Sequence, residues 1–127
     1  MFPVSIKGVL RLPNGQVVLA LNDRDEWELP GGRIEVGESA PECLAREFKE
    51  ELDVEVRVSS IIDSYLFEVI PGKQVFIVTY GCELVGPFAP EVSDEHLRIA
   101  TFALDALPAN LPPGYAHSIH TFHALTN

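Results

Sequence analysis

The segment from Ser39 to Leu52 constrains the fold of this chain most, because it has the pattern of one amphipathic helix among strand-forming segments. Ser39 and Glu42 match a capping box, and Pro41 falls in the first turn, where its missing N–H costs little. At about 100° per residue, the helix carries an apolar stripe of Pro41, Leu44, Ala45, Phe48 and Leu52. Such a stripe has to be buried against another element.

The rest of the chain supplies strands to pack against. Segments rich in β-branched and aromatic residues predict strands at Ser5 to Leu12, Gln16 to Leu21, Trp27 to Leu29, Val54 to Val58, Ile61 to Ile70, Gln74 to Leu84 and Leu97 to Phe102. A second helix is predicted at about Tyr115 to Leu125, after a Pro-Pro-Gly punctuation. The order predicts an α+β fold, a mixed β-sheet sandwiched between helices, in a single domain over residues 1–127.

The charge balance limits which ligands and partners the protein can bind. Nine Lys and Arg face nineteen Asp and Glu, for a net charge of −10. A chain this acidic has no basic stripe for polymeric nucleic acid and no attraction to an anionic membrane. A small phosphorylated ligand remains compatible when metal cations mediate the contact. Cys43 and Cys82 are expected to be reduced thiols, and the first eight residues do not resemble a secretion signal, so we expect a cytoplasmic protein.

A second face of the central helix carries the chemistry. Glu47, Glu50 and Glu51 are related as i, i+3 and i+4, so they cluster on a face other than the apolar stripe and repel one another. The wheel directs Arg46 and Lys49 elsewhere. Mg²⁺ would relieve the repulsion, because it prefers hard oxygen ligands and uses one or two carboxylates together with substrate phosphates. The alternative is an ordinary solvated acidic face.

The spacing upstream favours the metal site. Gly32 is followed after five residues by Glu38, and after seven more by Arg46-Glu47-Phe48-Lys49-Glu50-Glu51. This resembles the Nudix box, Gly-x5-Glu-x7-Arg-Glu-U-x-Glu-Glu-x-Gly-U, where U is a bulky apolar residue, and Val54 fills the last U. Asp53 stands where that family has glycine, a position that takes a left-handed backbone conformation, and aspartate tolerates this conformation better than most residues. With its flanks, the resemblance covers about Gln16 to Leu107.

The resemblance implies a Nudix α/β/α fold and a Mg²⁺-dependent hydrolase, with Mn²⁺ as the alternative metal, in which water attacks a diphosphate. Its metal ligands would be Glu47, Glu50 and Glu51 with the carbonyl of Gly31. Arg46 would join the catalytic set as an ion-pair partner that orients the glutamates. The general base would be a box glutamate (Glu47 or Glu50) or a glutamate of a later loop, with Glu95 first and Glu91 as its rival.

The entry segment of the box implies further contacts. Trp27, Gly32 and Glu38 are the candidate substrate-binding residues, with Glu38 supporting the loop or adding an outer-sphere contact, and Trp27 either in the core or on the ligand. The substrate is a small nucleotide-like diphosphate: a nucleoside triphosphate, ADP-ribose or a nucleotide sugar. A homodimer is left open as a further partner. The competing function is a Nudix-fold module that binds a nucleotide without cutting it, but this chain keeps all the box glutamates.

For two other groups of residues, the sequence favours ordinary surface or core positions over a functional role. His117, His120 and His123 recur every three residues in the last helix but lack a metal-binding His-Glu-x-x-His form, so we interpret them as surface or half-buried residues. Tyr65, Phe67 and Phe76 lie on predicted strands, where aromatic residues more often belong to the core than stack on a nucleobase.

Overall fold

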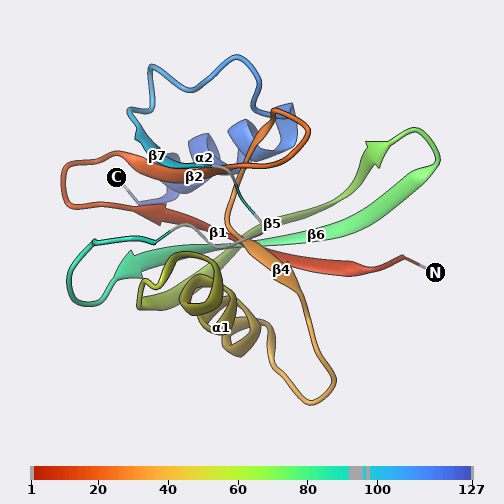
Figure 1. The fold of residues 1–127 in the computed structure, drawn as a ribbon, viewed down its shortest axis with the longest axis horizontal. Helices are drawn as coiled ribbons and strands as arrows, with labels where there is room; N and C mark the ends of the chain where they lie inside the picture. Colours follow the sequence, from red (N-terminus) through yellow and green to blue (C-terminus); the bar gives the residue numbers. More distant parts are fainter. Residues whose placement is uncertain (1, 92–95, 97, 127) are drawn as a thin grey trace.

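The computed structural model describes residues 2–91, 96 and 98–126, and in these residues a mixed seven-stranded sheet lies between two helices (Figure 1). The strands are β1 (Val4–Arg11), β2 (Val17–Leu21), β3 (Trp27–Glu28), β4 (Gly31–Arg33), β5 (Val56–Ile70), β6 (Lys73–Leu84) and β7 (Arg98–Phe102). The helices are α1 (Ala40–Leu52) and α2 (Pro113–Leu125). The predicted α+β class, with the sheet between helices, is confirmed. No described helix has both the length and the apolar character that a membrane span requires.

Strand β1 is the centre of the sheet. The main order is β3-β2-β1-β6-β5, in which β1 runs parallel to β6 and antiparallel to β2. β4 pairs with the first half of β1, and β7 pairs with β2. The long β5–β6 hairpin extends away from the rest of the sheet, as Figure 1 shows in green. Because β1 carries three neighbours, its residues are brought close to both helices and to β4.

One detail of the strand prediction is wrong. Val54 to Val58 and Ile61 to Ile70 do not form two strands, since β5 continues from Val56 to Ile70 through Ser59 and Ser60, where its register with β6 is irregular. A further strand that was not predicted, β4, places Gly31 and Gly32 against Ile6 and Lys7 of β1. Gly31 has a φ of 146°, and a side chain there would collide with the backbone of Ile6, so only glycine allows this close pairing.

Each helix covers its own core on one face of the sheet. α1 buries Cys43, Leu44, Phe48 and Leu52 together with Ile6, Leu10 and Cys82. α2 buries Tyr115, Ile119 and Phe122 with Val9, Leu19, Trp27 and Leu29. Two glycines of the sheet allow this approach: a Cβ on Gly8 would lie 2.7 Å from the ring of Phe48, and a Cβ on Gly81 would overlap the ring of Phe122.

The helix wheel was right for three residues of the stripe and wrong at its edges. Leu44, Phe48 and Leu52 are fully buried, whereas Pro41 is exposed and Ala45 is only half-buried. Cys43 and Glu51 are buried instead, because β4 packs against α1 on the side where the wheel alone expects solvent. Glu51 therefore does not lie on a face away from the protein interior.

Both ends of α1 follow the sequence signals. The Ser39 hydroxyl accepts from the N–H of Glu42, and the Glu42 carboxylate accepts from the N–H of Ser39, which completes the capping box. Asp53 takes the left-handed conformation expected of the family's glycine, with φ 55° and ψ 43°, and its N–H donates to the carbonyls of Phe48 and Lys49. The departure at Asp53 thus leaves the end of the helix intact.

The N-cap of α1 provides a test of the helix that carries the glutamates. Ser39→Ala removes the acceptor for the N–H of Glu42, so we expect the free energy of unfolding in urea to fall by about 1 kcal/mol. Ser64→Ala, on the exposed part of β5, is the control and should leave stability within about 0.5 kcal/mol. An unchanged Ser39→Ala variant would contradict the role of the cap.

Candidate functional site

Helix α1 packs against β4 (Figure 1), and two of its glutamates contact that strand. The backbone N–H of Gly31 donates to Oε2 of Glu51 over 3.1 Å. Gly32 lies directly beneath the carboxylate of Glu47, because a Cβ at Gly32 would be 2.5 Å from the carboxyl carbon of Glu47. The two glycines that the sequence places at the start of the box therefore meet two of its three glutamates.

Arg46 is the cation around which the acidic residues gather. Its guanidinium lies 3.0 Å from carboxylate oxygens of both Glu47 and Glu50, 2.6 Å from Glu38 and 3.7 Å from Glu35. The wheel points Arg46 away from these groups, but its long side chain bends back to reach them. The geometry agrees with the ion-pair role inferred for Arg46 from the family resemblance.

Glu38 closes the loop between β4 and α1. One oxygen accepts from the N–H of Glu35 and from Arg46 Nη2, and the other accepts from Arg46 Nε, so the pair is bidentate. These bonds, that to Arg46 foremost, lower the pKa of Glu38 to about 2. Glu38 thus supports the loop, as one of the two predicted roles requires, and its direct contact with substrate stays a prediction.

Glu51 is the most buried of the three box glutamates, with 4% of its surface exposed. Burial raises its pKa to about 7, against the opposing effects of Lys7, His96 and the N–H of Gly31. A carboxyl group held this way is ready to change its protonation state near neutral pH, which is a property of functional sites.

A second charged group, which was not predicted from the sequence, lies beside Glu51. Lys7 of β1 donates to Oε2 of Glu28 over 3.1 Å, and Oε1 of Glu28 lies 3.3 Å from Nε2 of His96. Burial by itself would raise the pKa of Glu28, but Lys7 and His96 lower it to about 2. The hydrogen bond to Glu28 raises the pKa of His96. The available signal was a single lysine inside the apolar segment Ser5 to Leu12.

Two cavities meet at this charged group. The first, of about 260 Å³, is polar and is lined by Lys7, Asn22, Asp23, Arg24, Glu28, Gly31, Glu51 and His96. The second, of about 110 Å³, is mainly apolar and is lined by Ser5, Lys7, Arg24, Glu28, Phe67, Val69, Val75, Ile77 and Tyr115. Because Lys7, Arg24 and Glu28 line both, the two cavities adjoin, and we refer to them together as the cleft, with Glu51 on its polar side and the rings of Phe67 and Tyr115 on its apolar side.

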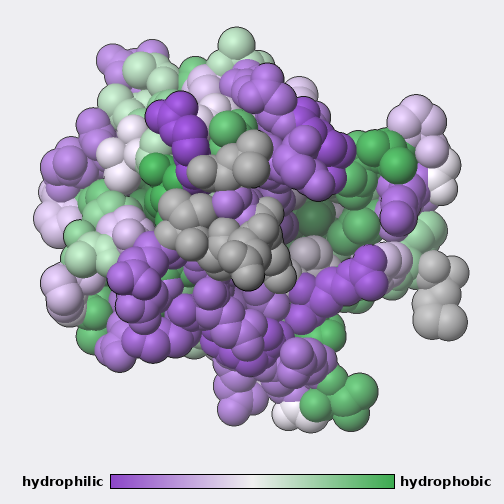
Figure 2. Space-filling view, in the orientation of Figure 1, coloured by the Kyte–Doolittle hydropathy of each residue, from purple (hydrophilic) through white to green (hydrophobic). Residues whose placement is uncertain are grey.

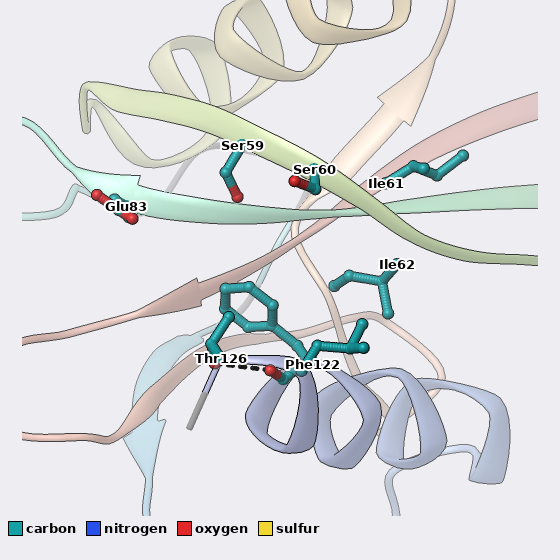
Figure 3. Close-up of a pocket in the computed structure, with 8 residues that line it drawn as sticks. Ser59, Ser60, Ile61, Ile62, Glu83, Phe122 and Thr126 are labelled. Carbon is teal, nitrogen blue, oxygen red and sulfur yellow. Dashed lines mark hydrogen bonds between the residues drawn. The ribbon is translucent and has the colours of Figure 1, made fainter.

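A larger cavity, of about 360 Å³, lies elsewhere between β5, β6 and the end of α2 (Figure 3). Ile61, Ile62, Phe122 and Leu125 line it, and none of the predicted site residues does. In the face drawn in Figure 2, by contrast, hydrophilic residues gather over α1. We therefore place the site in the smaller cleft beside Glu51, where the charged groups converge, and not in the larger cavity.

The other predicted residues have mixed outcomes. Trp27 is buried against Phe102 in the α2-side core, and a contact with ligand stays a prediction. Phe67 is half-buried and packs edge-to-face on Tyr115, whereas Phe76 is exposed, so its assignment to the core was wrong. The helix α2 histidines, His117, His120 and His123, are exposed, as interpreted from the sequence.

The candidate bases outside the box lie beyond α1. Glu91 is exposed, and its backbone N–H donates to the carbonyl of Leu52 at the end of the helix. Glu95 lies outside the described residues. The choice between these two and a box glutamate stays a prediction.

The donor set suits a divalent metal, although its groups are not arranged as a finished metal site. Among the described residues, no three His, Cys, Asp or Glu side chains converge in a metal-ready geometry. Glu47 and Glu50 both reach Nη1 of Arg46, which brings two carboxylates to one point, and Glu51 is fixed nearby on Gly31. Hard oxygen donors in this number are the ligands that Mg²⁺ prefers.

Comparison with known proteins gives a consistent family. The NUDIX domain model matches residues 1–122. An 8-oxo-dGTP diphosphatase of Haemophilus influenzae is 32% identical over 120 residues, which cover 89% of this chain and 85% of the relative. A dihydroneopterin triphosphate diphosphatase of Escherichia coli is 40% identical over 57 residues, 42% of this chain and 38% of that protein. A NUDIX hydrolase structure from Nitrosomonas europaea aligns with all of this chain and 92% of its own at a TM-score of 0.84 and 22% identity, which supports the fold.

The burial of Glu51 predicts a pH-dependent stability. Its folded pKa of about 7 lies above the ordinary 4.5, so ionisation costs stability progressively from pH 4.5 to 7 and fully above 7. Glu51→Gln, which keeps an acceptor for Gly31, should match the unmodified protein at pH 4 and exceed it by about 3 kcal/mol at pH 8. Urea unfolding in EDTA measures this. The neighbouring exposed Glu50→Gln is the control, and a Glu51→Gln variant without gain at pH 8 would contradict the argument.

The two glycines of β4 should respond differently to a methyl group. Gly32→Ala forces only the flexible end of Glu47 aside, so we expect a folded protein whose Mn²⁺ affinity is lower by about tenfold or more. Gly31→Ala would strike the backbone of β1 and should prevent folding. Calorimetric Mn²⁺ titration and circular dichroism distinguish the two variants. Unaltered Mn²⁺ binding by Gly32→Ala would remove Glu47 from the proposed ligand set.

Proposed function

The chain belongs to the Nudix family of pyrophosphohydrolases, and from this premise we propose that it hydrolyses the diphosphate link of a small nucleotide-like substrate with the help of Mg²⁺. The observation that supports the metal most directly is the meeting of Glu47 and Glu50 on Arg46, beside Glu51 on Gly31. Without an arginine or a divalent cation between them, carboxylates at these helix positions would repel one another.

Glu47, Glu50 and Glu51, with the carbonyl of Gly31, are the proposed ligands of Mg²⁺, and Mn²⁺ is the alternative. When bound, the metal neutralises phosphate oxygens and makes the attacking water more acidic. With the metal bound, Arg46 would retain its bidentate contact with Glu38, because that contact does not involve Glu47 or Glu50. Arg46 thereby keeps the helix and the preceding loop in register.

The attacking water needs an acceptor for its proton. Glu47 and Glu50 lie within the site, and variants of the later glutamates Glu91 and Glu95 decide between the two groups of candidates. A Glu91→Gln or Glu95→Gln variant that lowers kcat without changing metal affinity would identify that residue as the base, whereas normal kcat in both would leave the role to Glu47 or Glu50.

The cleft suggests how the rest of the substrate lies. Its polar part adjoins Glu51 and Gly31, where the diphosphate would bind, and its apolar part reaches Phe67 and Tyr115, which suit the nucleoside. A nucleoside triphosphate is our first substrate class, since the relatives matched from Haemophilus influenzae and Escherichia coli are named for triphosphates. ADP-ribose and a nucleotide sugar are the two other classes. The net charge of −10 favours small nucleotides over polymeric nucleic acid.

A substrate screen tests the proposal. Nucleoside triphosphates including oxidised forms, ADP-ribose and nucleotide sugars are incubated with and without Mg²⁺, and released diphosphate, phosphate and nucleoside monophosphate are quantified. We expect Mg²⁺-dependent turnover, and about a thousandfold lower kcat for Glu50→Gln, since metal-bound charge supplies several kcal/mol of the barrier reduction.

Glu68→Gln, an exposed glutamate on the β5–β6 hairpin, is the matched control and should keep full activity. Turnover that persists in EDTA and in the Glu50→Gln variant would exclude the metal mechanism. Failure of the unmodified protein to cut any of the three substrate classes would favour a module that binds nucleotides without cutting them.

A further inference from the structure

We propose that Lys7 forms an anion subsite, binding the substrate phosphate that lies on the nucleoside side of the bond to be cut. This inference rests on the proposed function, because it assumes a diphosphate that extends from the glutamates into the cleft. It assigns a binding role to a side chain of β1, which is distant in sequence from the Nudix box.

The placement of Lys7 in the sheet directs its side chain to the cleft. Its Cα pairs with Gly31 of β4 on one side and with Thr79 of β6 on the other. Only 7% of Lys7 is exposed, and its neighbours Ile6 and Gly8 point toward α1. A lysine buried in the centre of a sheet costs free energy unless its charge is compensated, so it has to be paired.

Glu28 pairs with Lys7 but does not use all of its donors. The ammonium group carries three N–H donors, and among the described residues only Oε2 of Glu28 accepts one of them. The other oxygen of Glu28 is engaged with His96. The remaining donors of Lys7 are therefore available to an acceptor in the cleft, while Glu28 keeps the ammonium in position.

Lys7 lies where the two cavities join. Toward the box, the polar cavity contains Gly31 and Glu51, and toward the hairpin, the apolar cavity contains Phe67 and Tyr115. If the diphosphate of a substrate lies at the box and its nucleoside lies on the aromatic rings, Lys7 is next to the part of the substrate that connects them. The group at that point of a nucleotide is a phosphate, whose oxygens are the acceptors that an ammonium binds best.

Arg24 lines both cavities as well but is less suited to this role. Its side chain is 44% exposed and forms ion pairs with Asp23 and Glu26 at the rim of the cleft. A buried cation beside a substrate phosphate is screened far less by salt than an exposed one. The buried Lys7 is therefore expected to contribute more affinity than Arg24.

The alternative is that Lys7 only compensates the charges of Glu28 and Glu51. A binding measurement that does not depend on hydrolysis separates the two roles. The probe is methylenediphosphonate, an uncleavable diphosphate without a nucleoside, titrated calorimetrically with and without Mg²⁺. We expect Lys7→Met to weaken its binding by about ten- to a hundredfold, and Lys7→Arg to retain part of it.

Arg57→Met is the matched control, because it removes one positive charge from β5 at the edge of the sheet, where Arg57 pairs with exposed Glu83. It should bind the probe as the unmodified protein does. If Lys7→Met does not fold, Lys7→Met combined with Glu28→Gln replaces it, since removing both members of this ion pair leaves neither of their two charges buried alone. That double variant should show the same loss of affinity.

Folded Lys7 variants that bind the probe normally would overturn the proposal and leave Lys7 as a structural counter-ion. A loss confined to uncleavable nucleotides, with methylenediphosphonate unaffected, would overturn it too, since Lys7 would then contact the nucleoside. The proposal would also be overturned if the unmodified protein did not bind the probe, either with or without Mg²⁺. Failure of the proposed function would appear separately, as normal probe binding without turnover of any substrate.

Discussion

The mutual repulsion of carboxylates is the constraint on which the structure of the site depends. Glu35, Glu38, Glu47 and Glu50 all approach one guanidinium, that of Arg46. Exposed ion pairs contribute little individually, but here one cation holds several acidic groups in a shared geometry. Arg46 thus lets the folded protein keep its acidic side chains together before any divalent cation binds. The bidentate contact with Glu38 also holds the loop before α1 against the helix. The same guanidinium therefore compensates the acidic charges and fixes the loop.

The close approach of β4 to α1 adds a second constraint, and glycine makes it feasible. Gly31 lets β4 pair tightly with β1, and Gly32 leaves room for the carboxylate of Glu47. The same approach covers Glu51 and brings its carboxylate to the N–H of Gly31. Burial of that carboxylate opposes folding, and the raised pKa of about 7 expresses the cost. This cost arises at one of the three glutamates that we propose as metal ligands.

The sequence predicted the parts of the site that are local. Ser39, Glu42 and Asp53 act through contacts within a few residues, so their spacing was enough to locate both ends of α1. The family resemblance likewise implied that Arg46 pairs with the glutamates, and its guanidinium contacts Glu47 and Glu50. The burial of Glu51 could not be predicted from a helical wheel, because it depends on β4. Pairing with β1, which is distant in sequence, holds β4 against the helix. The contact between Lys7 and Glu28 spans 21 positions and depends on the order of the strands, which no local pattern specifies.

The acidic side chains of the site differ in how exposed their partners are, and this difference determines how easily each contact is broken. Glu50 is largely exposed and Arg46 is partly exposed. An ion pair between such groups contributes little stability, so a divalent cation can displace Arg46 from Glu50 at little cost. Glu51 and Glu28 are nearly covered, and their partners Gly31 and Lys7 belong to neighbouring strands of the sheet. Removing either partner would leave a buried charge unpaired, so these contacts are costly to break. The contacts of Glu51 and Glu28 are therefore held more firmly than the exposed ion pair between Glu50 and Arg46.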